Sequence, residues 1–163
     1  MNNPKPNPKE RTLVLLKPDA LQRGIVGEII DRFEQKGIKI VGMKLIKLSD
    51  AILNEHYSAH KGKSFFVPTK TFMMMLPVVA LALEALEVVQ VVRTMCGPTN
   101  ARTAAPGTIR GDYSMAISRN LVHSSEDTKA AKRELAIFFK PSELVSYRRA
   151  DEQFFYSEEE GLV

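Results

Sequence analysis

The sequence has no tryptophan, a single cysteine and no apolar run long enough to cross a membrane. The lone Cys96 excludes a disulfide within the chain, which agrees with a reducing compartment. A membrane-spanning helix needs about 20 apolar residues, and no such stretch occurs. The first ten residues are rich in Asn, Pro and Lys and lack the apolar segment of a secretion signal. These absences favour a cytoplasmic protein without a membrane anchor.

What the chain does contain is typical of one folded domain. Its 163 residues are 44% hydrophobic and 26% charged, which suffices for a buried core. We expect a flexible polar arm over residues 1–10, a domain over residues 11–150 and a tail of that domain over residues 151–163. The net charge of +4 hints at an anionic partner, but it does not separate nucleotides from nucleic acid or a membrane surface.

Hydrophobic patterning predicts strands that alternate with helices. The segments predicted as strands are 12–16, 38–48, 77–83 and the short 121–122. The segments predicted as helices are 25–36, a short stretch after Ser49, 61–75, 87–96 and 126–139. This order fits an α+β fold of the ferredoxin-like (split βαβ) kind. We expect a four-stranded antiparallel sheet covered by helices, with a long structured loop around Pro106 over residues 100–112.

Two residues are predicted to cap helices. Asp19 follows the first strand and suits the start of the next helix. Ser49 suits the start of the short helix that carries His56 and Tyr57.

Two apparent binding motifs are incomplete. Gly62-Lys63-Ser64 resembles the end of a phosphate-binding P-loop, but that motif requires glycine at position 57, which is tyrosine. His56 and His60 are spaced i,i+4 on a predicted helix, as two zinc ligands would be. No third ligand is apparent from the sequence, and the glutamate of the HExxH zinc motif is missing. A surface or half-buried histidine pair is therefore favoured.

A region rich in arginine and threonine is a candidate for phosphate binding. Its members are Arg93, Thr99, Arg102, Thr103, Thr108, Arg110 and Arg119. Arginines in such a region are as often solvated surface residues as ligands. The segment 106–112 (PGTIRGD) favours the second interpretation, because its two glycines let the backbone approach a ligand closely and its Arg and Thr donate to phosphate oxygens.

His123 is the candidate nucleophile. Residues 121–122 are expected to form a short buried strand that delivers it to the start of a helix, where Ser125-Glu126-Asp127 suit the N-terminus. An imidazole can serve as a nucleophile or general base near neutral pH, but a lone histidine at a strand end is more often structural. This motif by itself leaves both interpretations open.

Together the motifs resemble those of the nucleoside diphosphate kinase family over residues 11–147. The segments that carry the resemblance are Lys17-Pro18-Asp19, Gln22-Arg23-Gly24, Gly27-Glu28-Ile29-Ile30, residues 32–37, Glu55-His56-Tyr57, Phe65-Phe66, Pro77-Val78-Val79-Ala80, Gly97 with Thr99-Asn100, residues 106–112, and Arg119-Asn120 with His123. They occur in the order and with the gaps of that family.

The resemblance implies a ping-pong reaction. The γ-phosphate of a nucleoside triphosphate, typically ATP, would pass to a nucleoside diphosphate through a phosphohistidine on His123. Mg²⁺ would bridge the nucleotide phosphates, with no metal ligand expected from the protein. Glu134 matches the glutamate that orients the imidazole in that family, and Tyr57 would lie beside the histidine.

The same resemblance implies the nucleotide contacts. Lys17 would contact the ribose hydroxyl and the transferring phosphate, Asn120 would bind the sugar hydroxyl, and Phe65 would stack on the base. An aromatic ring stacks on any base, which suits an enzyme of broad nucleotide range. The remaining phosphate ligands would be Arg93, Thr99 and Arg110.

A few positions depart from the family pattern. The usual His-Gly-Ser-Asp is His123-Ser124-Ser125-Glu126 here, Leu76 stands where a glycine often precedes the strand 77–83, and Pro98 stands where an acidic residue is common. Ser124 is expected to crowd the backbone amides near the phosphate, and Glu126 reaches one methylene farther than aspartate. These changes bear on rate and nucleotide preference, because none removes a primary catalytic group.

The resemblance also implies a homo-oligomer, with a hexamer favoured over a tetramer, because the loop around Pro106 commonly lies at subunit contacts in the family. One alternative is a non-catalytic nucleotide-binding relative, which the loss of the histidine or of phosphate ligands would favour. Another is a nucleic-acid-binding protein, suggested by the pI near 9.2. The sequence lacks a recognition-helix motif and any basic cluster interleaved with aromatics, so we do not expect nucleic acid as a partner.

Overall fold

The computed structural model describes residues 9–157 and residue 160. Most of the expected N-terminal arm and the last part of the expected tail therefore lie outside the described residues. Among the residues described, no helix is long and apolar enough to cross a membrane.

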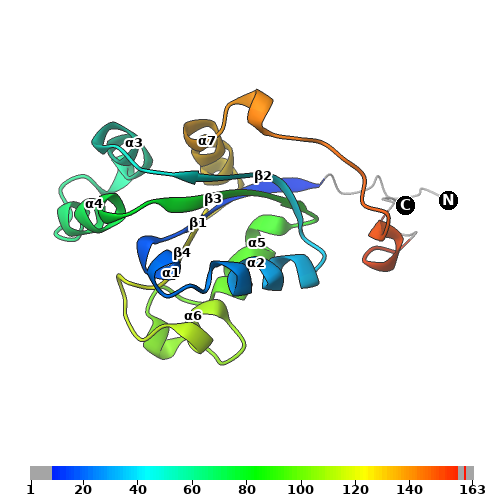
Figure 1. Cartoon of the computed structure of the whole chain (residues 1–163), viewed down its shortest axis with the longest axis horizontal. Helices are drawn as coiled ribbons and strands as arrows, with labels where there is room; N and C mark the ends of the chain where they lie inside the picture. Colours follow the sequence, from blue (N-terminus) through cyan, green and yellow to red (C-terminus); the bar gives the residue numbers. More distant parts are fainter. Residues whose placement is uncertain (1–8, 158–159, 161–163) are drawn as a thin grey trace.

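One four-stranded antiparallel sheet forms the centre of the fold (Figure 1). Its strands are β1 (Glu10–Leu16), β2 (Lys39–Ile46), β3 (Val78–Ala85) and β4 (Val122–Ser124). They lie in the order β2-β3-β1-β4, and every neighbouring pair is antiparallel. This order is that of a split βαβ unit, which confirms the predicted α+β, ferredoxin-like fold.

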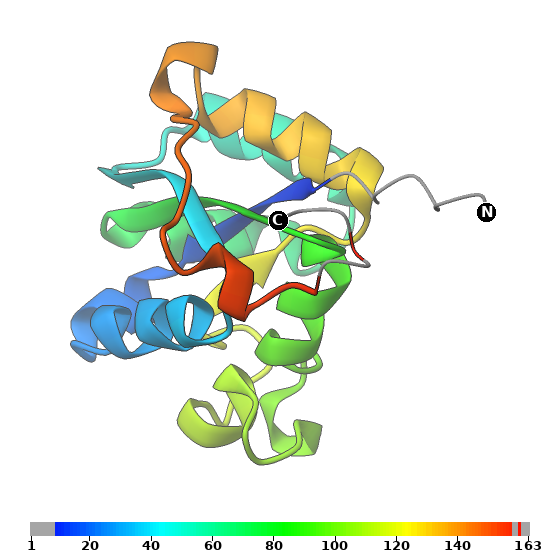
Figure 2. The same cartoon turned by 90° about the vertical axis from the view of Figure 1, so that its right-hand side faces the viewer.

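Helices cover both faces of the sheet (Figures 1 and 2). The first face carries α1 (Pro18–Gln22), α2 (Val26–Gln35), α5 (Val88–Cys96) and α6 (Ile109–Tyr113). The second face carries α3 (Asp50–His56), α4 (Phe66–Met75) and α7 (Thr128–Phe138). Short 3-10 turns lie at Ser58–His60, Ala101–Thr103, Pro141–Glu143 and Glu152–Phe154.

Alternation along the central strand β1 divides the core in two. Leu13 and Leu15 pack with α3, α4 and α7, whereas Val14 and Leu16 pack with α2 and α5. All four side chains are fully buried, because helices cover both faces. In β4, His123 pairs with Leu15, so its side chain belongs to the α3–α7 face of the sheet.

The two predicted helix caps have different outcomes. Ser49 caps α3, since its side chain accepts a hydrogen bond from the amide of Ile52. Asp19 does not cap α1, and that prediction is wrong. The helix begins at Pro18, whose fixed φ suits the first helical position, so Asp19 already lies inside it. Its carboxylate instead accepts a hydrogen bond from the amide of Leu121 at 3.0 Å.

The segment 100–112 is more regular than the long loop that we expected. It contains a 3-10 turn, and its end belongs to α6. Thr108 caps α6 by accepting a hydrogen bond from the amide of Gly111. Asp112 pairs with Arg32 of α2 at 2.7 Å, so the segment is fixed against the neighbouring helix.

The described part of the C-terminal tail lies against the sheet. The amide of Val145 donates to the carbonyl of Val41 in β2 at 2.7 Å. Farther along, Glu152 forms an ion pair with Lys9 just before β1. The first of these contacts places the tail beside β2, the edge strand opposite β4.

Candidate active site

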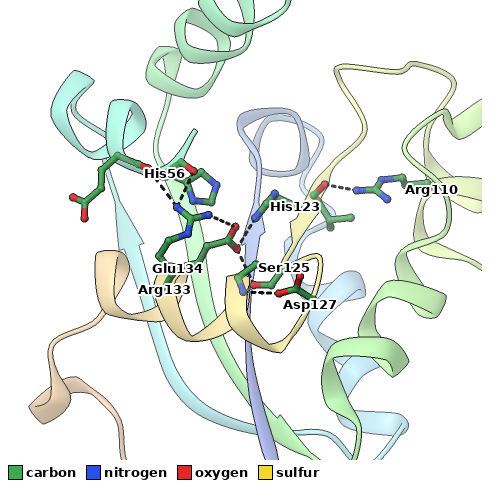
Figure 3. A network of polar contacts seen from close by, with 10 residues as sticks. His56, Arg110, His123, Ser125, Asp127, Arg133 and Glu134 are labelled. Carbon is green, nitrogen blue, oxygen red and sulfur yellow. Dashed lines mark hydrogen bonds and ion pairs between the residues drawn. The ribbon is translucent and has the colours of Figure 1, made fainter. Parts of the chain in front are cut away.

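His123 stands in the middle of β4, where we expected it at a strand end that leads directly into a helix. The strand continues to Ser124, and α7 begins only at Thr128, capped by Asp127. The Nε2 atom of His123 lies 3.0 Å from Oε2 of Glu134 in α7 (Figure 3). A strand and a helix thus hold the imidazole between them.

Glu134 is a buried carboxylate behind the imidazole. The hydroxyl of Ser125 donates to its Oε2 at 2.8 Å, the same oxygen that faces His123. Burial by itself would raise the pKa of Glu134, but the hydrogen bond and charge interaction with His123 outweigh burial and lower the pKa to about 2. Glu134 is therefore ionised at neutral pH and accepts the proton that His123 carries on Nε2.

His56 is buried beside His123, so the expectation of a surface or half-buried histidine pair is wrong for this residue. Its ring lies edge-to-face with the His123 ring, at 4.6 Å between centroids and 82° between planes (Figure 3). Burial and the neighbouring His123 lower the pKa of His56 to about 3. A neutral imidazole thus packs against the candidate nucleophile.

A cavity of about 390 Å³ opens in front of His123. Its lining includes eight of the nine residues singled out from the sequence: Lys17, Tyr57, Phe65, Arg93, Thr99, Arg110, Asn120 and His123. The ninth, Glu134, lies behind the His123 ring. Residues far apart in the sequence, from Lys17 to Ser124, therefore meet around one cavity.

Lys17 forms the buried floor of the cavity. Its Nζ donates to Oδ1 of Asn120 at 2.6 Å and to the carbonyl of Ser118 at 3.3 Å. The side-chain amide of Asn120 donates in turn to the carbonyls of Thr99 and Ile117. Burial lowers the pKa of Lys17 to about 8, with the charge of Arg110 adding to the effect.

The cavity has a positive electrostatic character. Lys17, Arg93 and Arg110 line it, and its described lining contains neither aspartate nor glutamate. The buried guanidinium of Arg110 donates to the backbone carbonyls of Asn120, Gly97 and Val122, which leaves two of its five N–H groups for a ligand. Such a cluster of cations in a concave site attracts anions.

Two aromatic residues stand at different depths of the cavity. Phe65 immediately precedes α4 and is 49% exposed, so an aromatic face is available at the rim. Tyr57 lies deeper, with its ring centroid 6.5 Å from that of His123. Burial raises the pKa of Tyr57, so its hydroxyl keeps its proton at neutral pH.

Comparisons with known proteins give the family. Residues 10–144 match the family model described as nucleoside diphosphate kinase. The chain is 51% identical over 145 residues to the nucleoside diphosphate kinase of Desulfitobacterium hafniense (strain DSM 10664 / DCB-2), which covers 89% of this chain and 97% of that relative.

The chain belongs to the nucleoside diphosphate kinase family.

Solved structures agree with this family. A nucleoside diphosphate kinase from Halobacterium salinarum in complex with CDP matches with a TM-score of 0.90 at 42% identity, over 91% of this chain and 99% of that one. A transition-state mimic of the Borrelia burgdorferi enzyme with bound vanadate and ADP matches with a TM-score of 0.85 at 31% identity, over 91% and 98%. The predicted family and enzyme class, a phosphotransferase, are thereby confirmed.

Reasoning from the sequence missed several features of this nucleoside diphosphate kinase fold around the site. Neither the contact of His56 with His123 nor the hydrogen bond from Ser125 to Glu134 has a signature in residue spacing. Leu121, directly before β4, adopts a left-handed backbone conformation with φ 72°. Such a conformation costs a bulky residue about 1–3 kcal/mol. It persists because the Leu121 carbonyl accepts from the amide of Lys17 and its own amide donates to Asp19.

Proposed function

We propose that the protein passes the terminal phosphate of a nucleoside triphosphate to a nucleoside diphosphate through a phosphohistidine on His123. One observation carries this proposal. The ring of His123 opens into a cavity lined by three cations, while its Nε2 is held from behind by the ionised Glu134. A nucleophile between a buried base partner and a cationic pocket suits phosphoryl transfer.

The first half-reaction follows from the position of the ring proton. The Nε2–H of His123 donates to Glu134, so the lone pair lies on Nδ1. Nδ1 attacks the γ-phosphorus, a P–N bond forms and the P–O bond to the β-phosphate breaks. The diphosphate leaves with the electron pair on its terminal oxygen. Lys17 and Arg110 neutralise negative charge on the phosphates, which is the main contribution a protein makes to this chemistry.

The second half-reaction is the reverse of the first with another nucleotide. A terminal oxygen of a bound nucleoside diphosphate attacks the phosphorus, the P–N bond breaks, and its electron pair returns to Nδ1. Both nucleotides use one cavity, with the base against the exposed ring of Phe65 and the sugar near Lys17 and Asn120. Arg93, Thr99 and Tyr57 complete the proposed set around the phosphates and the histidine.

We propose that the cavity holds a divalent cation, Mg²⁺, through the phosphates of the bound nucleotide and not through protein ligands. The described lining offers no carboxylate, whereas Mg²⁺ is commonly held by substrate phosphates and water. When bound, Mg²⁺ would neutralise negative charge on the phosphate oxygens of the nucleotide. We further propose a cytoplasmic location and a homo-oligomer, with a hexamer favoured over a tetramer. Its mass in solution distinguishes the two assemblies.

Labelling with γ-³²P-ATP and Mg²⁺ tests the proposal. The native protein should acquire acid-labile label that an added nucleoside diphosphate removes. His123→Ala should acquire none, whereas His60→Ala, which alters another histidine of the same cavity, should still be labelled. Equal label on His123→Ala and the native protein would overturn the assignment of the nucleophile. Nucleotide binding without any label would instead support the non-catalytic alternative.

A further inference from the structure

The buried His56 has no role in the proposed transfer, yet it lies directly behind the nucleophile. It is only 3% exposed, and neither of its ring nitrogens has a hydrogen-bond partner among the described residues. An unpaired buried polar group is unfavourable, by about 1–3 kcal/mol. Buried polar groups without a hydrogen-bond partner are rare in native proteins, so His56 is a candidate for binding a ligand that the chain itself does not supply.

His56 forms a cluster with His123 and Glu134. One donor atom from each of the three side chains lies within 4.8 Å of the other two. Zinc binds imidazole nitrogen and carboxylate oxygen at about 2.0–2.2 Å, so two ligand atoms of a tetrahedral site lie about 3.4 Å apart. Side-chain rotations that move the donor atoms by about 1 Å therefore bring all three to one ion. Figure 3 shows the three side chains converging from α3, β4 and α7.

The surroundings of the cluster leave donor atoms available to an ion. Both ring nitrogens of His56 lack a hydrogen-bond partner among the described residues, so His56 can offer a lone pair. Oε2 of Glu134 faces His123, whereas Oε1 lies 3.5 Å from Arg133. Oε2 is therefore the carboxylate oxygen that an ion would share with His123.

We propose that His56, His123 and Glu134 form an inhibitory site for a borderline divalent cation, of which Zn²⁺ is the representative. Two imidazoles and one carboxylate are a ligand set that zinc enzymes use, with a further position left for water. The hard Mg²⁺ prefers oxygen ligands and does not compete for the two imidazoles. The site thus distinguishes the activating cation from the inhibiting one.

Inhibition follows from the two nitrogens of His123 and rests on the proposed function. An ion shared with Glu134 must bind Nε2 of His123, because that nitrogen faces the carboxylate. The ion replaces the hydrogen bond to Glu134, the ring proton moves from Nε2 to Nδ1, and Nδ1 is then no nucleophile. The side chain of His123 is 21% exposed and lines the nucleotide cavity, so the ion enters by the same route as the substrate. Bound nucleotide and a phosphorylated His123 should both exclude it.

Binding of Zn²⁺ alone, measured by calorimetry without nucleotide, tests the site directly. The native protein should bind one ion per chain, and Zn²⁺ should raise its Tm. His56→Phe keeps a ring in the buried position and should weaken binding by more than about 100-fold, since loss of a ligand exceeds the effect of losing a supporting contact. Should His56→Phe fold poorly, His56→Gln gives the same comparison. His60→Ala is the matched control and should bind as the native protein does.

The control separates two zinc sites. If His60→Ala abolishes binding and Glu134→Gln does not, the ion is held by His60 together with His56, and the proposal is wrong. Equal binding by native protein and His56→Phe also overturns it. In the labelling assay, Zn²⁺ should prevent phosphohistidine formation in the native protein at concentrations that leave His56→Gln unaffected. If the protein binds Zn²⁺ but acquires no label from ATP even in the absence of Zn²⁺, the proposed function is refuted and the metal site is retained.

Discussion

The two sides of the His123 ring differ in almost every physical respect. In front lies an open cavity of about 390 Å³ with Lys17, Arg93 and Arg110 in its lining. Behind lie the ionised carboxylate of Glu134 and the neutral ring of His56, both buried. The front can attract and bind an anion, whereas the back can fix the proton and the orientation of the ring.

This difference assigns separate kinetic effects to the two sides. In the proposed reaction, groups behind the ring contact no substrate, so changes there should lower kcat with little effect on KM. Groups at the rim are proposed to contact the nucleotide away from the transferred phosphate, so changes there should raise KM. Cations on the cavity floor are proposed to contact the transferring phosphate, so changes there should lower kcat/KM.

The largest effect is expected behind the ring. Glu134→Gln keeps the shape of the side chain but removes the charge that holds the proton on Nε2 of His123. We expect kcat to fall on the order of 10²-fold, a typical contribution of a positioned acid–base partner, with KM unchanged. Steady-state kinetics measure both constants. Glu34→Gln alters an exposed carboxylate of α2 outside the cavity lining; it is the control and should behave as the native protein. A rise in KM with kcat preserved would contradict the division between the two sides.

An intermediate effect is expected at the cavity floor as a function of pH. Because burial lowers the pKa of Lys17 to about 8, its ammonium form dominates below pH 8 and is lost above it. The value of kcat/KM should therefore fall about tenfold between pH 7 and pH 9, following the fraction of charged Lys17. Bound phosphate favours the ammonium, so the fall in kcat should begin at higher pH.

A variant of Tyr57 serves as the control for assigning this fall in kcat/KM to Lys17. Burial raises the pKa of Tyr57, so Tyr57→Phe should leave the fall in place. If the fall in kcat/KM at high pH disappears in Tyr57→Phe, or if kcat/KM of the native protein stays constant through pH 9, the charge of Lys17 does not govern binding.

The smallest effect is expected at the rim. Phe65→Ala removes the 49% exposed ring on which the base is proposed to stack. Stacking on a half-exposed ring contributes about 1 kcal/mol, so KM should rise about fivefold for every nucleotide, with kcat preserved. Phe66→Leu, at the next residue and outside the described cavity lining, should leave KM unchanged. A loss in kcat for Phe65→Ala would place the ring near the chemistry instead.

Much of the fold could be predicted from local sequence. The branched segments near residues 12–16, 38–48 and 77–83 form strands, because runs of such residues fill a sheet that helices cover on both faces. The capping role of Ser49 was predictable because a cap depends only on its own helix. The misassignment of Asp19 arose because its partner, the amide of Leu121, is remote in sequence.

The candidate site shows the same limit more strongly. Single motifs left His123 open between a structural and a catalytic role, and only the combined resemblance pointed to nucleophilic chemistry. The contact between Glu134 and His123 was taken from the family, since it depends on how α7 packs against β4. The burial of His56 depends on the packing of α3 against α7, which no local pattern encodes.

The strained backbone of Leu121, directly before β4, bears on when the cavity can form while the chain is being synthesised. Its backbone is held by Lys17 and Asp19, and Lys17 also contacts Asn120 across 103 positions of the chain. Contacts between such distant segments close large loops and form late in folding. A ribosome must therefore extend the chain well past β4 before the cavity floor exists. A nascent chain that ends before Asn120 lacks both this partner of Lys17 and His123, so the proposed site cannot yet form.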